Sequence, residues 1–270
     1  MQKLKLKSGN EIPILGLGTW QLSGKDCKEA VKKAIKLGYT HIDTALIYEN
    51  QEEIGEALKE IKVDRAKLFI TSKVWRDNLD YHGVLGQCDE VLYELGVDYV
   101  DLLLIHWPNS LMPMGETFKA FKELISEGKV KQIGVSNFTI NHLKKAMEVS
   151  EVPITVNQVE YHPYLNQEEL LNFCKKNNII LTAYSPLARG EVFKDNLLKE
   201  IAEKYNKSAA QVTLRWLIQK GIVVIPKSKN EKKIKENKEI FDFKLKREDV
   251  DKINNIKIKK RLVNPAFSEF

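Results

Sequence analysis

Long apolar runs, closely spaced cysteines and a glycine-rich phosphate fingerprint are all missing from this chain of 270 residues. Because no run of about 18 apolar residues occurs, a membrane span is not expected. The N-terminal stretch MQKLKLKSGNEIPILG alternates with a period of two and lacks both an apolar segment and a small-residue cleavage site. We therefore interpret it as folded structure and not as a signal peptide.

Cysteines are few and isolated. Cys27, Cys88 and Cys174 are an odd number, lie far apart and form no CxxC pair. This pattern argues against a disulfide framework or a zinc site and fits a reducing compartment. We therefore expect inert buried thiols, no bound metal and a cytoplasmic location.

The net charge of +6 comes mainly from lysine, which is interleaved with glutamate and aspartate along the chain. Nucleic-acid binding requires basic side chains gathered on one face, so no nucleic-acid partner is expected. One local excess, IPKSKNEKKIKENKE at 225–239, would suit a single anionic ligand.

Two kinds of segment alternate along the sequence. Short apolar runs rich in β-branched residues predict buried parallel strands, and apolar residues at i, i+3 and i+4 predict helices between them, as at 27–38 and 168–178. The predicted strands are residues 14–20, 39–45, 67–74, 100–107, 130–137, 154–161, 179–185 and 221–228. Ahead of them, KLKLKSG and NEIPI flank the turn Ser8-Gly9-Asn10, which indicates a β-hairpin.

Eight strand–helix units in about 250 residues are typical of a closed barrel. The predicted fold is therefore α/β, a (β/α)8 TIM barrel with an N-terminal β-hairpin. No linker, repeat or low-complexity segment divides the chain, so we expect residues 1–270 to form a single domain. The alternative is a doubly wound open sheet, which would normally carry a GxGxxG fingerprint. In GLGTWQLSG, the residues Thr19, Trp20 and Gln21 break that spacing.

In such a barrel, catalytic groups occupy the C-terminal ends of the strands and the loops that follow. Polar or aromatic residues stand at the end of every predicted strand. They are Thr19 and Trp20, Asp43 and Tyr48, Lys73 and Trp75, His106 and Trp107, Ser136 and Asn137, Gln158, Tyr184 and Ser185, and Lys227 and Ser228.

An acid, a lysine and a histidine at the ends of consecutive strands suggest a proton-donating device built on Tyr48. A free phenol has a pKa of about 10, and an adjacent ammonium such as Lys73 would lower that pKa. Asp43 would keep the lysine charged, and His106 would orient a carbonyl oxygen. Protonation of that oxygen would accompany hydride transfer, which requires a nicotinamide cofactor.

Each of these groups taken alone has a simpler explanation. Asp43 and Lys73 could form a structural ion pair. His106 could be a core histidine, and Tyr48 could cap a loop. Their order along the chain, at matching strand ends, favours the catalytic interpretation.

The ordered motifs IDTALIYENQEEIG, TSKVW, LLLIHWP, IGVSNF, NQVEYHP, AYSPLARG and IPKS followed by IKEN resemble the aldo-keto reductase superfamily over nearly the whole chain. The resemblance points to its prokaryotic aldehyde and keto-sugar reductases. It implies NADPH-dependent reduction of aldehydes and ketones, including keto-aldehydes or keto-sugars, to alcohols. Tyr48 would be the general acid of a catalytic tetrad completed by Asp43, Lys73 and His106. Histidine at position 106, where double-bond reductases carry glutamate, implies carbonyl reduction.

The resemblance also implies ligand contacts. The cofactor-binding positions would be Thr19, Ser136, Asn137, Gln158, Tyr184, Ser185, Leu187, Lys227, Ser228, Lys233, Glu236 and Asn237. The substrate-binding positions would be Trp20, Trp75, His106 and Trp107. Lys233 stands where the family usually has an arginine, and it keeps the charge but loses the planar fork. NADPH is therefore expected, with NADH as a weaker alternative.

Two other functions fit a barrel of this size. A cofactor-sensing regulatory subunit on the same fold would bind nucleotide, turn over slowly and have a membrane partner, but no appended interaction segment is visible. A phosphosugar isomerase or aldolase would carry glycine-rich phosphate loops after the seventh and eighth strands, which AYSPLARG and IPKSKN do not provide.

The loops around the predicted mouth are short. The loop PNSLMPMGETF and the tail RLVNPAFSEF predict an open, permissive pocket, with Phe267 and Phe270 as candidates for its rim. We expect a monomer that acts on a small carbonyl substrate, with neither a membrane nor a nucleic acid as a partner.

Overall fold

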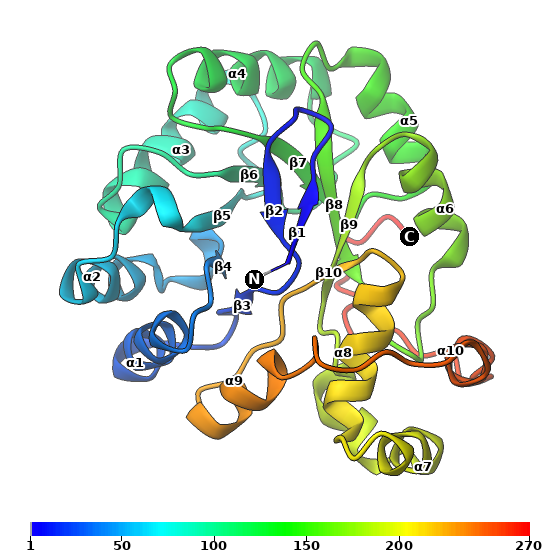
Figure 1. The fold of residues 1–270 in the computed structure, drawn as a ribbon. Helices are drawn as coiled ribbons and strands as arrows, with labels where there is room; N and C mark the ends of the chain where they lie inside the picture. Colours follow the sequence, from blue (N-terminus) through cyan, green and yellow to red (C-terminus); the bar gives the residue numbers. More distant parts are fainter. Residues whose placement is uncertain (1) are drawn as a thin grey trace.

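In the computed structural model, which describes residues 2–270, eight parallel strands curl into a barrel with the helices outside (Figure 1). The strands are β3 (Leu17–Gly18), β4 (His41–Asp43), β5 (Phe69–Val74), β6 (Leu102–Ile105), β7 (Ile133–Ser136), β8 (Ile154–Glu160), β9 (Ile180–Tyr184) and β10 (Val223–Val224). The α-helices are α1 (Gly24–Lys36), α2 (Gln51–Ile61), α3 (Tyr81–Leu95), α4 (Met114–Ser126), α5 (Ile140–Val149), α6 (Glu168–Lys176), α7 (Asn196–Lys204), α8 (Ala209–Gln219), α9 (Glu231–Lys238) and α10 (Arg247–Asn254). All eight predicted strands are confirmed, each shorter than or equal to its predicted range.

The predicted hairpin is also confirmed. Strands β1 (Lys3–Lys5) and β2 (Glu11–Pro13) pair antiparallel and lie in front of the strand ring in Figure 1. Leu6 and Ile12 pack against apolar residues from the first half of the barrel strands, such as Phe69 and Leu102. The hairpin therefore covers the N-terminal end of the barrel, and ligands must enter at the other end.

The barrel closes where the chain segment of β3 meets β10. Leu15 bridges to Val224 in parallel, and the Gly16 amide donates to the Val224 carbonyl at 2.9 Å. A Cβ atom on Gly18 would lie 2.6 Å from the Ile225 carbonyl oxygen, so only glycine permits this approach. The glycines of GLGTW thus serve barrel closure, which explains why they do not follow the phosphate-binding spacing.

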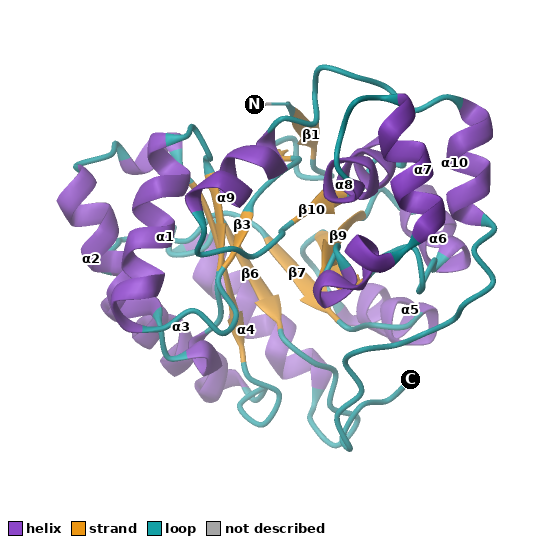
Figure 2. Cartoon of the chain, turned by 90° about the horizontal axis from the view of Figure 1, so that it is seen from below, coloured by secondary structure: helices purple, strands orange, loops and turns teal. Residues whose placement is uncertain are grey.

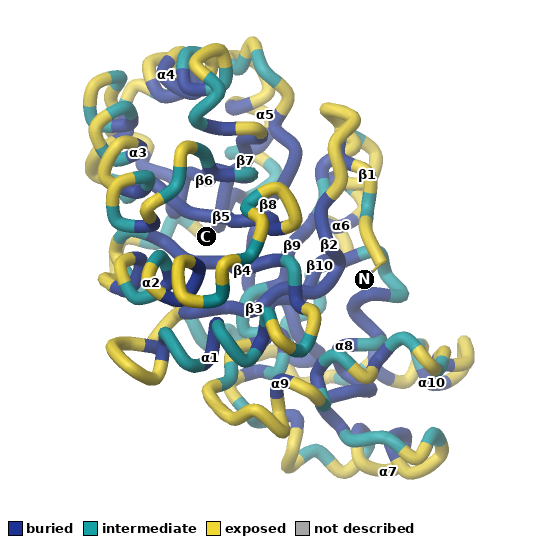
Figure 3. Tube along the Cα trace, turned by 60° about the vertical axis from the view of Figure 1, so that its left-hand side comes forward, coloured by how far each residue is buried: buried dark blue, intermediate teal, exposed yellow. Residues whose placement is uncertain are grey.

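Most helices turn an apolar stripe towards the barrel, whereas α8 is buried nearly all round. The barrel strands are almost entirely buried (Figure 3). In α1, Cys27, Ala30, Val31 and Ala34 are buried at i, i+3, i+4 and i+7. The two helices predicted at 27–38 and 168–178 correspond to α1 and α6.

The expectation of buried thiols is confirmed. Cys27, Cys88 and Cys174 are all free and buried, and burial raises the pKa of each thiol to about 12. Within residues 2–270, no helix is both long enough and apolar enough to cross a membrane.

The chain departs from a simple strand–helix alternation after β9. A 3-10 segment, η3 (Ala188–Lys194), and two helices, α7 and α8, stand between β9 and β10. Asp195 starts α7 by accepting from the Leu198 amide at 3.0 Å, and Ser208 starts α8 with a capping box. Residues 255–270, all within the described part of the chain, form no helix or strand and run past α6 and α5 towards the C-terminus (Figure 2).

Candidate active site

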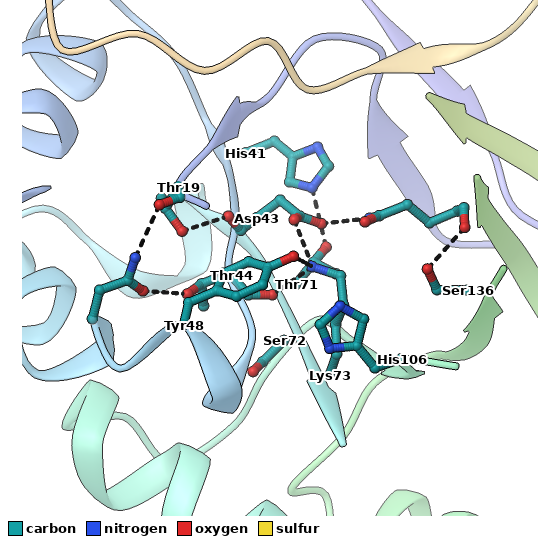
Figure 4. Close-up of polar contacts among 12 residues, drawn as sticks. Thr19, His41, Asp43, Thr44, Tyr48, Thr71, Ser72, Lys73, His106 and Ser136 are labelled. Atoms are coloured by element: carbon teal, nitrogen blue, oxygen red, sulfur yellow. Dashed lines mark hydrogen bonds and ion pairs between the residues drawn. The ribbon is translucent and has the colours of Figure 1, made fainter. Parts of the chain in front are cut away.

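A buried ion pair joins the ends of two neighbouring strands. Lys73 of β5 donates from Nζ to Asp43 Oδ1 of β4 at 2.7 Å and to the Thr44 carbonyl oxygen at 2.7 Å (Figure 4). The Lys73 side chain is 0% exposed and that of Asp43 is 3% exposed. Charges this far from water need such complete pairing, because burial of an unpaired ion costs several kcal/mol (about 3–5 kcal/mol when one partner is removed).

The Asp43 carboxylate is held from its other side as well. Gln158 of β8 donates from Nε2 to Asp43 Oδ2 at 2.6 Å. Thr19 Oγ1 donates to the Asp43 backbone carbonyl at 2.9 Å. These hydrogen bonds connect the ends of β3, β4, β5 and β8 at the mouth of the barrel.

Tyr48 reaches this pair through a tight turn. The chain leaves β4 at Asp43, forms the 3-10 segment η1 (Leu46–Tyr48) and turns at Glu49, which has a left-handed φ of 53°. The turn brings the Tyr48 hydroxyl to 3.4 Å from Lys73 Nζ. The five residues from Asp43 to Tyr48 therefore form the turn that leads from the end of β4 back to Lys73.

Asn50 fixes that turn and was given no role from the sequence. It is fully buried, and Oδ1 accepts from Thr44 Oγ1 at 2.8 Å. Its Nδ2 donates to the carbonyls of Thr19 at 3.0 Å and Leu22 at 2.9 Å. Asn50 thereby joins the loop that carries Tyr48 to the loop that carries Trp20. Its only signal in the sequence was its place in the motif YENQ.

The expected direction of the Tyr48 pKa is wrong. Burial raises the pKa of the phenol well above its usual value, and the negative charge of Asp43 raises it further. Burial also lowers the pKa of Lys73, against the opposing effect of Asp43. The cation of Lys73 is largely matched by the Asp43 carboxylate, so it does not outweigh the loss of water around Tyr48. The phenol therefore stays protonated at neutral pH.

His106 lies close to Tyr48 at this end of the barrel. Its ring centroid lies 5.6 Å from that of Tyr48 and 5.4 Å from that of Trp75. Burial, and then the charge of Lys73, lower the pKa of His106 well below its usual value. Its Nδ1 is buried without a hydrogen-bonding partner among residues 2–270. The imidazole is therefore neutral at pH 7.

A cluster of amide and hydroxyl groups lies beside the ion pair. Asn137 donates to the His106 carbonyl at 3.0 Å and accepts from the Tyr184 hydroxyl at 2.7 Å. Ser136 donates to the Gln158 carbonyl at 2.8 Å. Both Asn137 N–H groups are engaged within the protein, whereas Gln158 keeps Oε1 and one N–H for a ligand.

One cavity of about 1170 Å³ lies in front of these groups. Of the residues predicted for catalysis, cofactor or substrate, only Lys73 does not line it, because Lys73 lies behind Tyr48 and Asp43. The lining residues predicted from the sequence are Thr19, Trp20, Asp43, Tyr48, Trp75, His106, Trp107, Ser136, Asn137, Gln158, Tyr184, Ser185, Leu187, Lys227, Ser228, Lys233, Glu236 and Asn237.

Other lining residues were missed. Lys229 adds a cation beside Lys227 and forms an ion pair with Asp26 at 2.9 Å. Arg189 lies over the Trp20 ring at 4.8 Å. Residues 262–265 of the tail also line the cavity. Arg189 was visible in AYSPLARG. The tail was expected near the mouth, but no local pattern indicates that residues 262–265 are the ones that line the cavity.

Comparison with known proteins identifies one family over most of the chain. A model of the Aldo/keto reductase family matches residues 14–258. The glyoxal reductase of Bacillus subtilis (strain 168) is 48% identical over 252 residues, which cover 93% of this chain and 91% of that protein.

Solved structures share the fold. An aldo-keto reductase from a Medee basin deep-sea metagenome library has a TM-score of 0.94 and 42% identity, with 97% of each chain covered. An aldo-keto reductase in complex with NADPH has a TM-score of 0.94 and 36% identity, covering 99% of this chain and 91% of that chain. The predicted barrel class is therefore confirmed.

The ion pair generates a stability prediction. Lys73→Met leaves the Asp43 carboxylate buried without its cation, so we expect a loss of about 3–5 kcal/mol in the free energy of unfolding. The double variant Asp43→Asn/Lys73→Met removes both charges and should recover most of that loss. Urea unfolding of the three proteins measures both values. A double variant no more stable than Lys73→Met would contradict the assignment of the loss to an unpaired charge.

Proposed function

The chain belongs to the aldo/keto reductase family, and on this premise we propose that it is an NADPH-dependent reductase of small aldehydes and ketones. One observation carries the proposal. A protonated phenol, Tyr48, and a neutral imidazole, His106, face the same end of the large cavity, with the Lys73–Asp43 pair directly behind the phenol.

Tyr48 is proposed as the general acid. Its raised pKa keeps the proton on the phenol in the resting site. A carbonyl oxygen that gains negative charge becomes a far stronger base than a phenolate, so the proton transfer runs downhill only as reduction proceeds. Lys73 Nζ, 3.4 Å from the hydroxyl, then stabilises the phenolate that remains.

His106 is proposed to orient the substrate. A neutral imidazole donates one N–H, and its lowered pKa prevents a second charge from developing beside Lys73. The hydrogen bond to the carbonyl oxygen would hold that oxygen close to the Tyr48 hydroxyl. His106 would therefore polarise the carbonyl without competing as an acid.

The amide cluster fits a nicotinamide carboxamide. Gln158 keeps one acceptor and one donor, which is the complement of a primary amide, and Tyr184 offers an aromatic ring at the same wall. When bound, the nicotinamide supplies the hydride. The cavity of about 1170 Å³ exceeds the typical pocket range of about 300–1,000 Å³, as a dinucleotide together with a substrate requires.

The other end of the cavity fits the phosphate of NADPH. Lys227, Ser228 and Lys233 line it, and Lys229 adds a further cation. Three ammonium groups and a hydroxyl suit a phosphate ester, although none offers the bidentate fork of arginine. The NADPH complex of a related structure supports the choice of cofactor, and NADH is proposed as a weaker alternative.

The substrate end is apolar and aromatic. Trp20, Trp75, Trp107 and Ile47 line it, which suits small aldehydes, keto-aldehydes and keto-sugars whose carbonyl reaches Tyr48. The glyoxal reductase of Bacillus subtilis supports dicarbonyl compounds as substrates. A single eight-stranded barrel carries both the catalytic candidates and the cofactor positions, so we propose residues 1–270 as one domain and the monomer as the functional unit.

Replacing the proposed acid tests the mechanism. Tyr48→Phe removes the proton donor and keeps the ring, so kcat with glyoxal, methylglyoxal and benzaldehyde should fall about 10²- to 10⁴-fold. Consumption of NADPH, followed by absorbance, measures the rate. The NADPH dissociation constant, from fluorescence titration, should change little.

Tyr93→Phe is the matched control, because Tyr93 is 84% exposed and is not among the residues that line the cavity. Equal turnover by the native chain and Tyr48→Phe would rule out Tyr48 as the acid. NADPH binding without turnover of any carbonyl would instead favour the regulatory function.

The pKa shifts predict a flat pH profile. Loss of activity at low pH requires protonation of His106, whose pKa is lowered, and loss at high pH requires ionisation of Tyr48, whose pKa is raised. We therefore expect kcat/KM for an aldehyde, at saturating NADPH, to vary less than about two-fold between about pH 6 and 9. An acidic limb centred near 6.5, the ordinary histidine value, would contradict a neutral, buried His106.

Lys233→Arg tests the phosphate end. A planar guanidinium pairs with a phosphate through two hydrogen bonds, so the ratio of kcat/KM with NADPH to that with NADH should rise roughly three- to ten-fold. Lys232→Arg, on the same helix but absent from the cavity lining, is the control. An unchanged ratio in Lys233→Arg would remove this residue from the phosphate site.

A further inference from the structure

Two fully buried titratable residues have no place in the proposed mechanism. Glu160 and His162 belong to the motif NQVEYHP, in which only Gln158 was given a role. Both side chains are 0% exposed. A buried carboxylate requires strong hydrogen-bond donors, and the partners of Glu160 show what it holds.

The Glu160 carboxylate collects three donors. Oε1 accepts from the Leu262 amide at 2.7 Å, and Oε2 accepts from the Val263 amide at 2.8 Å. His162 Nε2 lies 2.8 Å from Oε1. Because His162 Nδ1 accepts from the Tyr164 amide at 3.2 Å, the ring proton is on Nε2 and points at the carboxylate. His162 therefore supplies the third N–H donor.

These hydrogen bonds determine the charge of Glu160. Burial alone pushes the pKa of this carboxyl up, but the bonds from His162, Leu262 and Val263 outweigh burial, and its pKa lies below the usual value. The side chain is thus an anion. It is stabilised by N–H donors, two of which belong to the C-terminal tail.

The tail from residue 260 to 270, here called the C-terminal strap, returns to the mouth of the barrel. Its residues 262–265 line the cavity. Farther along, the Phe267 ring packs edge-on against Trp75 at 5.6 Å and Trp107 at 5.4 Å. The strap thus supplies one wall of the substrate end and braces two of the tryptophans.

Other contacts also hold the strap along its length, among them the packing of Leu262 against the hydrophobic core and of Phe270 against Trp107. The Lys260 amide donates to the Tyr164 carbonyl at 2.8 Å, and Arg76 donates to the Phe267 carbonyl at 2.7 Å. Glu269 accepts from the Ser110 amide at 3.0 Å and lies 3.1 Å from His142 Nε2. The Glu160 contact differs from these because its carboxylate is completely buried.

We propose that Glu160 is a positioning residue for substrate binding, which clamps the C-terminal strap at Leu262 and Val263 and thereby sets one wall of the substrate pocket. This inference rests on the proposed reductase function for its kinetic consequence only. The claim that Glu160 holds the strap does not depend on which reaction the protein catalyses.

Glu160→Gln is the sharpest test because it keeps the shape and removes the charge. Glutamine offers one oxygen and one NH2 group to three N–H donors, so at least one donor of the strap or of His162 meets another donor. Hydrogen exchange, measured by mass spectrometry, should accelerate at 260–270 and remain unchanged in the barrel strands.

Kinetics then separate positioning from general damage. The KM for benzaldehyde should rise on the order of ten-fold, the size expected for a lost charge-assisted hydrogen bond. The KM for glyoxal should rise less, because glyoxal has few atoms to contact the wall. We expect kcat and the NADPH dissociation constant to change less than about two-fold, because the strap touches neither Tyr48 nor Lys227.

Glu191→Gln is the matched control. Glu191 pairs with Lys260 of the same strap, but both side chains are partly exposed, so exchange and KM should stay at native values. Should Glu160→Gln not fold, Val263→Pro deletes one strap amide and leaves the core intact. It should reproduce the faster exchange and the higher KM.

Unchanged exchange at 260–270 with unchanged KM would overturn the proposal. A parallel fall in kcat, NADPH affinity and barrel protection would also overturn it, because Glu160 would then support the whole barrel. If the native chain reduces no carbonyl, the reductase function fails, whereas the exchange comparison still decides whether Glu160 holds the strap.

Discussion

The Lys73–Asp43 ion pair is the interaction on which the rest of this site depends. An ammonium and a carboxylate without water can remain ionised only when every remaining hydrogen-bonding position is filled. Thr44 supplies a carbonyl oxygen to Lys73, and Gln158 supplies an N–H to Asp43. Strands β4, β5 and β8 must therefore keep their register at the mouth, and the rigid frame that results is what positions Tyr48.

The same pairing sets the charge state of the groups around it. Because the cation is matched by an adjacent anion, Tyr48 and His106 experience mainly the loss of water. The pKa of the phenol rises and that of the imidazole falls. Both groups are uncharged hydrogen-bond donors in the resting site, which suits a neutral carbonyl compound better than an anionic one. The lysines proposed to hold the cofactor phosphate, Lys227 and Lys233, line the same cavity at other positions.

The sequence predicts the eight strands and the hairpin because burial on both faces and turn chemistry are local properties. The sequence also predicts that the catalytic candidates lie close together, since the C-terminal ends of barrel strands meet at one mouth. It does not predict the direction of the Tyr48 pKa, which depends on how deeply a loop residue is buried. Asn50 and Glu160 were missed for a related reason, because most of their partners are backbone groups of distant loops. A backbone N–H or carbonyl leaves no mark on the residue type that carries it.

Strand β8 links the two halves of the cavity. Gln158 and Glu160 are two residues apart, and in a strand that spacing places both side chains on the same face. Gln158 reaches inward to Asp43, and Glu160, nearer the mouth, reaches the amides of Leu262 and Val263. One rigid strand therefore fixes the distance between the reacting groups and the wall formed by the strap. The strap has no secondary structure of its own, yet it can form a pocket wall. The buried Glu160 carboxylate accepts from the amides of Leu262 and Val263, and both hydrogen bonds form only when the strap lies in this position.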